Sequence, residues 1–387
     1  MKILAVFLDM MGGSYLRTIN ADAQRNPMDD LMEEYGGTVY KNCFTPAPDT
    51  PRSSACMWTG TYPRTNNCST RLKYPGDFLN PDLEHIWKIL YQKNYDVNIF
   101  MRRKQERIGL IPLTGHETVF HKSIYEFFDH VTITDNSFHF FYLPDFHKYN
   151  DDYHYTKRGF SKGSLHAAGL IRTIFEHYDI KNTFDYTIVF SDHGFRIVPQ
   201  TRHRHLIESD RTKTLMWLIS KGSGPLSADE KLRSNLDVMP TICEMIGYQT
   251  EHKAIDGISL LSERGHDYVF IEDHDSFEAH LGMIIEHWAV VTADIRYHWL
   301  EIDGKFTHEQ ECMFDETFFE ELVREKMCDY DKIRPVYKIL SRYRENIITA
   351  DIYSDGTPYK KHNKLHSGFY RIYAALLRRF YKMTGCL

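Results

Sequence analysis

Short apolar runs alternate with amphipathic stretches along most of the chain. Five runs have the length and the aliphatic and aromatic content of buried parallel strands, at residues 3–8, 97–101, 138–143, 187–190 and 215–219. Between them, residues 83–93 and 165–178 repeat apolar side chains at helical spacing. This alternation predicts an α/β fold in which helices cover both faces of a mostly parallel sheet. In such folds, ligands bind beyond the carboxyl ends of the strands.

The pattern changes after Gly257. Residues 268–272 are predicted as a strand, and residues 288–292 and 297–302 as a hairpin. Acidic, helix-prone sequence follows from 309 to 346. We therefore predict three parts: an α/β domain at residues 1–262 that carries the candidate site, an antiparallel subdomain at residues 263–345 that completes the fold, and a basic helical tail at residues 346–387.

The last twenty residues have a distinct pattern. Apolar and basic side chains alternate at helical spacing, which predicts a basic amphipathic helix over residues 366–385. The apolar positions are Phe369, Ile372, Leu376, Phe380 and Met383, and the basic ones are Arg371, Arg378, Arg379 and Lys382. This helix either docks on the body with its basic face in solvent or lies on an anionic membrane surface or a partner.

Composition narrows the class of protein. The 387 residues are 42% hydrophobic and 26% charged, as in soluble globular proteins. A net charge of -6 gives no argument for nucleic-acid binding. The 7 cysteines include no CxxC pair, which fits a reducing compartment. The apolar N-terminal run is too short for a signal peptide, and no stretch reaches the roughly 20 apolar residues that span a bilayer. The predicted location is the cytoplasm, and the oligomeric state is left undetermined.

Two acidic residues stand at predicted strand ends. Asp9 directly follows the first strand, and Asp192 follows the run at 187–190. An aspartate in this position also serves commonly as a turn or helix-cap residue. Here His193 follows Asp192, and Thr50 opens a helix-like stretch that ends in Thr-Gly. Carboxylate and imidazole groups together are ligands for manganese or zinc. We predict one divalent metal ion held by Asp9, Thr50, Asp192 and His193.

Such a site has a chemical use. Phosphate and sulfate esters carry negative charge that repels an incoming nucleophile, and a bound cation offsets that charge while lowering the pKa of a bound hydroxyl. Thr50 is then the predicted nucleophile, which forms a covalent intermediate and passes the group to water or to an alcohol. Arg52 is suited to bidentate contact with the ester oxygens. The alternative for Arg52 is an exposed surface charge.

The order of these motifs resembles the alkaline phosphatase superfamily, in its sulfatase-like branch, over roughly residues 3–300. A strand ending in Asp9 is similar to its first metal-binding strand. The segment 50–60 lies where sulfatases carry Cys-x-Pro-Ser-Arg followed by Thr-Gly, which puts Thr50 on the nucleophile position. Residues 237–241 resemble the Asp-x-x-Pro-Thr helix, and residues 256–260 resemble the Asp-Gly-x-Ser-Leu turn.

The resemblance implies further substrate-binding residues. Residues 90–104 resemble the helix, turn and strand that lead to a basic Lys-Trp-His site, which places Arg102 and Lys104 on its two basic positions. Residues 140–149 resemble the strand that ends in a substrate-facing histidine, here His147. A surface charge is the alternative for each of the two basic residues.

The sequence also departs from the family pattern at positions that bear on the nucleophile and the metal ion. Threonine at position 50 cannot be oxidised to formylglycine, and Ser54 stands where sulfatases have arginine. A threonine nucleophile is similar to that of nucleotide phosphodiesterases, phosphoethanolamine transferases and lipoteichoic acid synthases. Met10 replaces the second acid that sulfatases place after the first, which argues against a calcium site. His193 favours manganese or zinc, with calcium and magnesium as alternatives.

A second metal ion is left open. Two-metal phosphodiesterases add one aspartate and two histidines, and the candidates here do not fit that pattern: Asp145, His147, His203, His205 and His274. We expect one ion, with His147 and either His203 or His205 facing the substrate. The alternative for each histidine is a surface position, in a chain with 21 histidines.

Together these features predict a metal-dependent phosphoesterase or phosphotransferase that works through a covalent phospho-threonine. The predicted substrate is a phosphate mono- or diester on a glycan, lipid or polyol, and no nucleic acid is involved. Three alternatives stand beside it: a phosphoglycerol-type transferase of cell-surface polysaccharide synthesis, a hydrolase of sulfate esters, and a non-catalytic relative that binds an anionic glycan. The basic helix at 366–385 would suit work on lipid-linked precursors at the inner face of the membrane.

Overall fold

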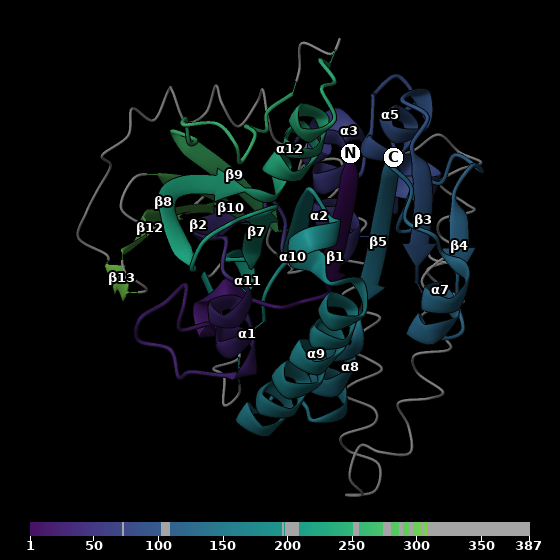
Figure 1. Ribbon diagram of the computed structural model, residues 1–387. Helices are drawn as coiled ribbons and strands as arrows, with labels where there is room; N and C mark the ends of the chain where they lie inside the picture. The colour runs from purple at the N-terminus through teal and green to yellow at the C-terminus, as the bar shows by residue number, and fades with distance from the viewer. Residues whose placement is uncertain are drawn as a thin grey trace, which may run out of the picture.

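A computed structural model of the chain describes residues 1–71, 73–101, 109–195, 197, 209–250, 255–273, 280–285, 289–294, 297–302 and 305–307. Its centre is an eight-stranded sheet with the order β4-β3-β5-β1-β6-β7-β2-β8 (Figure 1). The strands are β1 (Lys2–Leu8), β2 (Thr38–Phe44), β3 (Asp96–Phe100), β4 (Thr118–Phe120), β5 (Ser137–Leu143), β6 (Tyr186–Ser191), β7 (Met216–Ser220) and β8 (Ser227–Ser234).

Most neighbouring strands run parallel. β1 pairs in parallel with β5 and β6, β3 with β4 and β5, and β2 with β8. β7 is antiparallel to both β6 and β2, so the prediction that residues 215–219 form a parallel strand is wrong in direction. β7 is buried from Met216 to Ile219. An apolar run indicates that a strand is buried, but it does not indicate the direction in which the strand runs.

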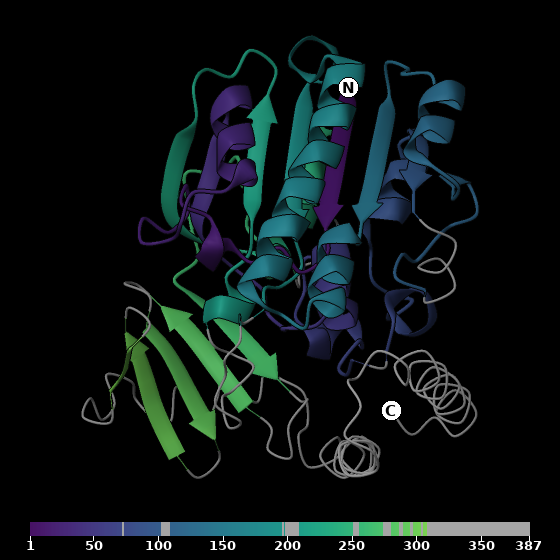
Figure 2. The same cartoon turned by 90° about the horizontal axis from the view of Figure 1, so that it is seen from below.

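Helices cover both faces of this sheet, as predicted. One face carries α2 (Thr50–Thr59), α5 (Ile86–Gln92) and α12 (Val238–Met245), whose buried side chains form one apolar core with Ile3, Ala5 and Phe7 of β1. The other face carries α1 (Pro27–Tyr35), α7 (Ile124–His130) and α9 (Lys157–Tyr178), which form a second core with Leu4, Val6 and Leu8. Figure 2 shows α1 and α9 on that second face.

The predicted helix at 165–178 is the C-terminal part of a longer one. α9 begins at Lys157, where the side chain of Thr156 caps its first turn. Its early turns contain Gly159 and Gly163. Because glycine weakens helices, the sequence does not predict this part of the helix. A Cβ at Gly163 would lie 3.0 Å from the Phe146 ring of α8 (Asp145–Asp152), so the glycine allows these helices to approach closely. Among the described residues, no helix combines the length and apolar character needed to cross a membrane.

The other helices within the described ranges are short. They are α3 (Pro63–Asn66), α4 (Pro75–Phe78), α10 (Ile180–Thr183) and α11 (Ser209–Thr212), with 3₁₀ turns η1 (Gly13–Tyr15) and η2 (Asn235–Asp237). Residues 237–241, which resemble the family's Asp-x-x-Pro-Thr helix, lie at the junction of η2 and α12. The Asp237 carboxylate accepts hydrogen bonds from the main-chain N–H groups of Ser234 and Ile258. It therefore joins this helix to the Asp-Gly-x-Ser-Leu turn at 256–260.

A second sheet follows the main one in the chain. Its strands are all antiparallel: β9 (Tyr268–Asp273), β10 (His280–Ile285), β11 (Ala289–Asp294), β12 (Tyr297–Ile302) and β13 (Lys305–Thr307). The predicted strand at 268–272 and the predicted hairpin are confirmed, while β10 was not predicted. Val269, Ile271 and Ile284 pack against Phe44 of β2, and the Glu272 N–H donates to the Pro46 carbonyl over 2.8 Å.

The three-part division at 262 and 345 stays a prediction. The acidic segment after residue 308 and the basic helix at 366–385 lie outside the described residues.

Candidate metal centre and nucleophile

The candidate site is set by the side-chain alternation of two neighbouring strands, β1 and β6. Ile3, Ala5 and Phe7 of β1 point into the core beneath α2, so the next residue of that parity beyond the strand is Asp9. On β6, Ile188 and Phe190 point the same way and the series continues to Asp192. Because β1 and β6 are parallel neighbours, both carboxylates emerge at one edge and on one face of the sheet.

Helix α2 brings Thr50 to the same place. Met57 and Trp58 of α2 pack in the core on that face, and Thr50 is the first residue of the helix. The Asp49 side chain caps the helix by accepting a hydrogen bond from the Arg52 N–H over 3.2 Å. As a result, Thr50 Oγ1 lies 3.4 Å from His193 Nε2. The structure therefore brings together all four predicted metal-site residues.

Three of these residues are arranged as metal ligands. Asp9, Asp192 and His193 are buried and offer ligand atoms that all lie within 4.8 Å of one another. His193 Nδ1 lies 2.8 Å from the Gly194 carbonyl, which fixes Nδ1 as the protonated nitrogen and leaves the Nε2 lone pair facing the site. Asp192 Oδ1 accepts a 2.8 Å hydrogen bond from the Met10 N–H. Asp192 Oδ2 is buried without a hydrogen-bond partner in the described part of the chain.

These features test whether a cation fits. Burial raises the pKa of Asp192, and the negative charge of Asp9 adds to that effect. Burial would also raise the pKa of Asp9, but His147, His193 and a hydrogen bond from Tyr142 outweigh it and lower that pKa. Two buried carboxylates with an unpartnered oxygen and an imidazole lone pair suit a divalent cation. The residues present therefore fit the predicted metal ion.

A chain of hydrogen bonds leads outward from Asp9. His147 Nδ1 lies 2.9 Å from Asp9 Oδ1, and His147 Nε2 lies 3.5 Å from Asp151 Oδ2. The Tyr155 hydroxyl donates to Asp151. Burial lowers the pKa of His147, but the Asp9 and Asp151 carboxylates outweigh it and raise that pKa. With 32% of its side chain exposed, His147 lies at the rim of the site.

The other predicted substrate-binding residues divide into two groups. Arg52 is fully buried, and its Nε donates a 2.6 Å hydrogen bond to Asp49 Oδ2. The alternative of an exposed surface charge is therefore wrong for Arg52, whose charge is engaged by Asp49. Arg102, Lys104, His203 and His205 lie outside the described residues, so their roles stay predictions.

Sequence reasoning missed a buried amide behind the site. Asn235 Nδ2 lies 2.9 Å from the Asp192 carbonyl, 3.0 Å from the Ser191 carbonyl and 3.0 Å from Ser53 Oγ. Ser53 Oγ also donates to the Asp192 carbonyl over 2.8 Å. These bonds tie α2 and η2 to the main chain that carries Asp192. A signal was present in the sequence, because Asn235 stands two residues before the Asp237 motif.

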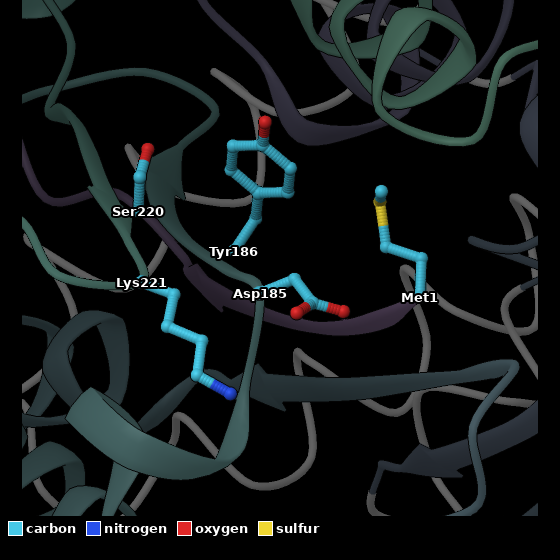
Figure 3. A pocket seen from close by; sticks show the side chains of 5 residues that line it. All are labelled: Met1, Asp185, Tyr186, Ser220 and Lys221. Carbon is cyan, nitrogen blue, oxygen red and sulfur yellow. The ribbon is translucent and has the colours of Figure 1, made fainter.

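A separate hollow of about 440 Å³ lies at the opposite edge of the sheet (Figure 3). It is lined by Met1, Asp185, Tyr186, Ser220 and Lys221, at the amino ends of β1 and β6. Asp185 there accepts a 2.8 Å hydrogen bond from the Lys2 N–H. Ligands of parallel sheets bind at the carboxyl ends of the strands, so this hollow is distinct from the candidate site.

No family model and no curated protein matches the sequence of this chain. Solved structures do match: a protein in the alkaline phosphatase superfamily from Vibrio parahaemolyticus superposes with a TM-score of 0.61 at 13% identity, covering 82% of this chain and 83% of the other. The chain has the alkaline phosphatase superfamily fold.

Two further structures extend that likeness. The phosphonate monoester hydrolase of Agrobacterium radiobacter matches with a TM-score of 0.53 at 13% identity, over 89% of this chain and 95% of that one. A 2-O GAG sulfatase matches with a TM-score of 0.57 at 12% identity, over 90% and 91%. The resemblance to the superfamily, and to its sulfatase-like branch, is thus confirmed at the level of the fold.

Proposed function

We propose that this protein is a metal-dependent enzyme that cleaves or transfers phosphate esters through a covalent intermediate on Thr50. The observation that carries the proposal is the placement of Thr50 Oγ1 3.4 Å from His193 Nε2, next to the buried cluster of Asp9, Asp192 and His193. A hydroxyl beside two carboxylates and an imidazole suits nucleophilic catalysis better than a purely structural role.

In the proposed reaction, Thr50 Oγ1 gives its proton to solvent and attacks phosphorus, and the bond from phosphorus to the leaving oxygen breaks. His147 sits at the rim between Asp9 and Asp151, and these carboxylates raise its pKa despite its burial. It is therefore placed to supply a proton to the leaving oxygen. A water molecule or an acceptor alcohol then attacks phosphorus and gives its proton to His147, and the bond from phosphorus to Thr50 Oγ1 breaks as Oγ1 takes up a proton from solvent.

Asp9, Asp192, His193 and Thr50 would hold the divalent ion, and manganese or zinc suits their mixture of oxygen and nitrogen donors. When bound, such an ion supplies positive charge that stabilises the ester oxygens and favours the ionised hydroxyl. The residues behind it keep the ligands in place: Asn235 and Ser53 hold the Asp192 main chain, and Met10 holds the Asp192 carboxylate.

The proposed substrate class rests on the nucleophile. Threonine cannot form the formylglycine that sulfate hydrolysis requires in the sulfatase-like branch, so we propose phosphorus as the reacting centre. A glycan, lipid or polyol phosphate is the proposed substrate, in the cytoplasm or at the inner face of the membrane. Among the solved structures of this fold, the phosphonate monoester hydrolase acts at phosphorus by its name, which supports this choice.

The test is a matched substrate and metal screen. Protein stripped with a chelator is assayed on p-nitrophenyl phosphate, bis-p-nitrophenyl phosphate and p-nitrophenyl sulfate, with manganese, zinc, magnesium and calcium in turn. We expect turnover of a phosphate ester with manganese or zinc. Thr50→Ala should abolish it, and Thr50→Ser should retain part of it. Thr173→Ala, which removes a hydroxyl of α9, is the control.

Three results of this screen would change the proposal. Unchanged turnover by Thr50→Ala removes Thr50 from the mechanism. Turnover of the sulfate ester alone moves the substrate class to sulfate. If the chelated protein recruits none of the four metals, the enzyme proposal fails and a non-catalytic binding role takes its place.

A further inference from the structure

Tyr142, the last-but-one residue of β5, reaches the candidate metal centre from beneath. Its side chain continues the series Phe138 and Phe140, which point into the core under α2. Its ring packs on Phe7 with centroids 5.0 Å apart. Of the three aromatic rings in this row, the one nearest the carboxyl edge carries a hydroxyl, and that hydroxyl donates to Asp9 Oδ2.

The position of this bond is set by strand register. Tyr142 is paired with Phe7 across β5 and β1, and Asp9 lies two residues beyond Phe7. The Asp9 N–H donates to the Leu143 carbonyl over 3.2 Å, which extends the pairing to the site. A tyrosine is long enough to span the remaining distance from the β5 backbone to the carboxylate. Both partners are buried: Tyr142 is 3% exposed and Asp9 is 4% exposed.

The bond completes a two-sided restraint on Asp9. Oδ2 accepts from Tyr142, and Oδ1 faces His147 Nδ1 at 2.9 Å. A carboxylate oxygen has two lone pairs, so each oxygen keeps one for a metal ion. Groups that hydrogen-bond a metal ligand fix its orientation and tune its affinity. The ring of Tyr142 is buried in the core, whereas the side chain of His147 is partly exposed at the rim of the site.

We infer that Tyr142 is a positioning residue that orients the Asp9 carboxylate for metal binding. The inference rests on the proposed function, because it concerns the metal of that same site. Tyr142 touches Asp9 rather than substrate. Its removal therefore weakens metal binding without removing a ligand.

The test compares two buried tyrosines. Tyr142→Phe removes the hydroxyl and repeats the ring already present at Phe138 and Phe140, so the core is kept. Tyr178→Phe is the control, because the Tyr178 hydroxyl is also buried and has no hydrogen-bond partner among the described residues. Mn²⁺ is titrated into chelated wild type and both variants, and the free ion is followed by electron paramagnetic resonance. Circular dichroism melting of the metal-free proteins checks that they fold.

We expect Tyr142→Phe to bind Mn²⁺ roughly 10- to 100-fold more weakly than wild type, the range seen when such supporting groups are lost. The spectrum of bound Mn²⁺ should change as well, while Tyr178→Phe keeps the wild-type affinity and spectrum. An unchanged dissociation constant and spectrum in Tyr142→Phe overturns the inference but leaves the proposed function standing, provided that Asp192→Asn loses the metal. Failure of wild type to bind any of Mn²⁺, Zn²⁺, Mg²⁺ and Ca²⁺ overturns both.

Discussion

The Met10 N–H donates a 2.8 Å hydrogen bond to Asp192 Oδ1, and Met10 makes this bond from a left-handed backbone conformation with φ 69. Non-glycine residues rarely adopt this conformation, because Cβ approaches the following carbonyl oxygen. The bond joins the ends of β1 and β6 directly at the candidate metal centre. The side chain of Met10 packs into the apolar core on the opposite face from Asp9.

This conformation predicts a difference between two neighbouring methionines. Met10 and Met11 are both buried in the same core, but only Met10 is left-handed. Met10→Gly and Met11→Gly each lose a buried side chain, while glycine relieves the strain only at position 10. We expect Met10→Gly to be less destabilising by about 1–2 kcal/mol. Urea unfolding measures both, and equal losses would show that Met10 stores no strain.

Replacing the side-chain amide of Asn235 with a carboxylate should strongly lower the stability of the protein. Asn235→Asp replaces the NH₂ group that faces the carbonyls of Ser191 and Asp192 with a carboxylate oxygen. A buried charge aimed at carbonyl oxygens should lower the free energy of unfolding by about 3 kcal/mol or more. Metal affinity should fall too, because Asp192 loses its support.

The control for that change is Asn94→Asp. Asn94 is exposed and left-handed with φ 54, a conformation that aspartate also tolerates. Urea unfolding should show no loss there. A small loss at position 235, comparable with that at 94, would mean that the amide is dispensable.

The start of α2 predicts an order among substitutions at Asp49. Asp49 caps the helix through the Arg52 N–H and binds the buried Arg52 guanidinium. Asp49→Ala loses both, at about 1 kcal/mol for the cap and about 3–5 kcal/mol for the broken buried ion pair. Asp49→Asn keeps a capping oxygen and should cost less. Thermal unfolding decides, and an equal cost for both variants would assign the whole effect to charge.

His139 predicts an acid-dependent loss of stability. It is fully buried on β5, neither ring nitrogen has a hydrogen-bond partner within the described residues, and burial lowers its pKa from 6.5 to about 4. The unfolded chain therefore binds a proton below pH 6.5 that the folded protein takes up only near pH 4. Stability should fall as the pH drops through this window, by on the order of 3 kcal/mol in total.

The measurement is urea unfolding between pH 4 and pH 7. His139→Phe places an apolar ring among Phe127, Tyr178 and Phe184, the rings that surround His139. It should flatten the pH dependence and raise stability. His116→Phe, at an exposed position, should leave the acid dependence of the wild type. If the stability of His139→Phe falls with decreasing pH as steeply as that of wild type, groups other than His139 cause the acid dependence.

Much of the site could be predicted because its ligands stand at strand ends. Asp9 and Asp192 follow apolar runs that only a buried strand would use, and parallel strands bring such ends together. The direction of β7 could not be predicted, because an apolar run encodes burial alone. β8 was missed because its sequence, Ser227–Ser234, is mostly polar and exposed. The bonds from Tyr142, Asn235 and Met10 depend on register and backbone angles, which no single-sequence pattern specifies.

The candidate ligands lie far apart in the chain, so the site forms only once β1 and β6 have paired. Asp9 leaves β1, the first strand, and Asp192 leaves β6, with β5 paired to β1 on its other side. A partly folded chain that lacks β6 offers no ion-binding cluster of this kind. A metal that binds here therefore favours the fully folded protein alone, by about 2.7 kcal/mol at a free concentration a hundredfold above its dissociation constant. Supply of the ion would then govern how much of the protein survives proteolysis, apart from any effect on turnover.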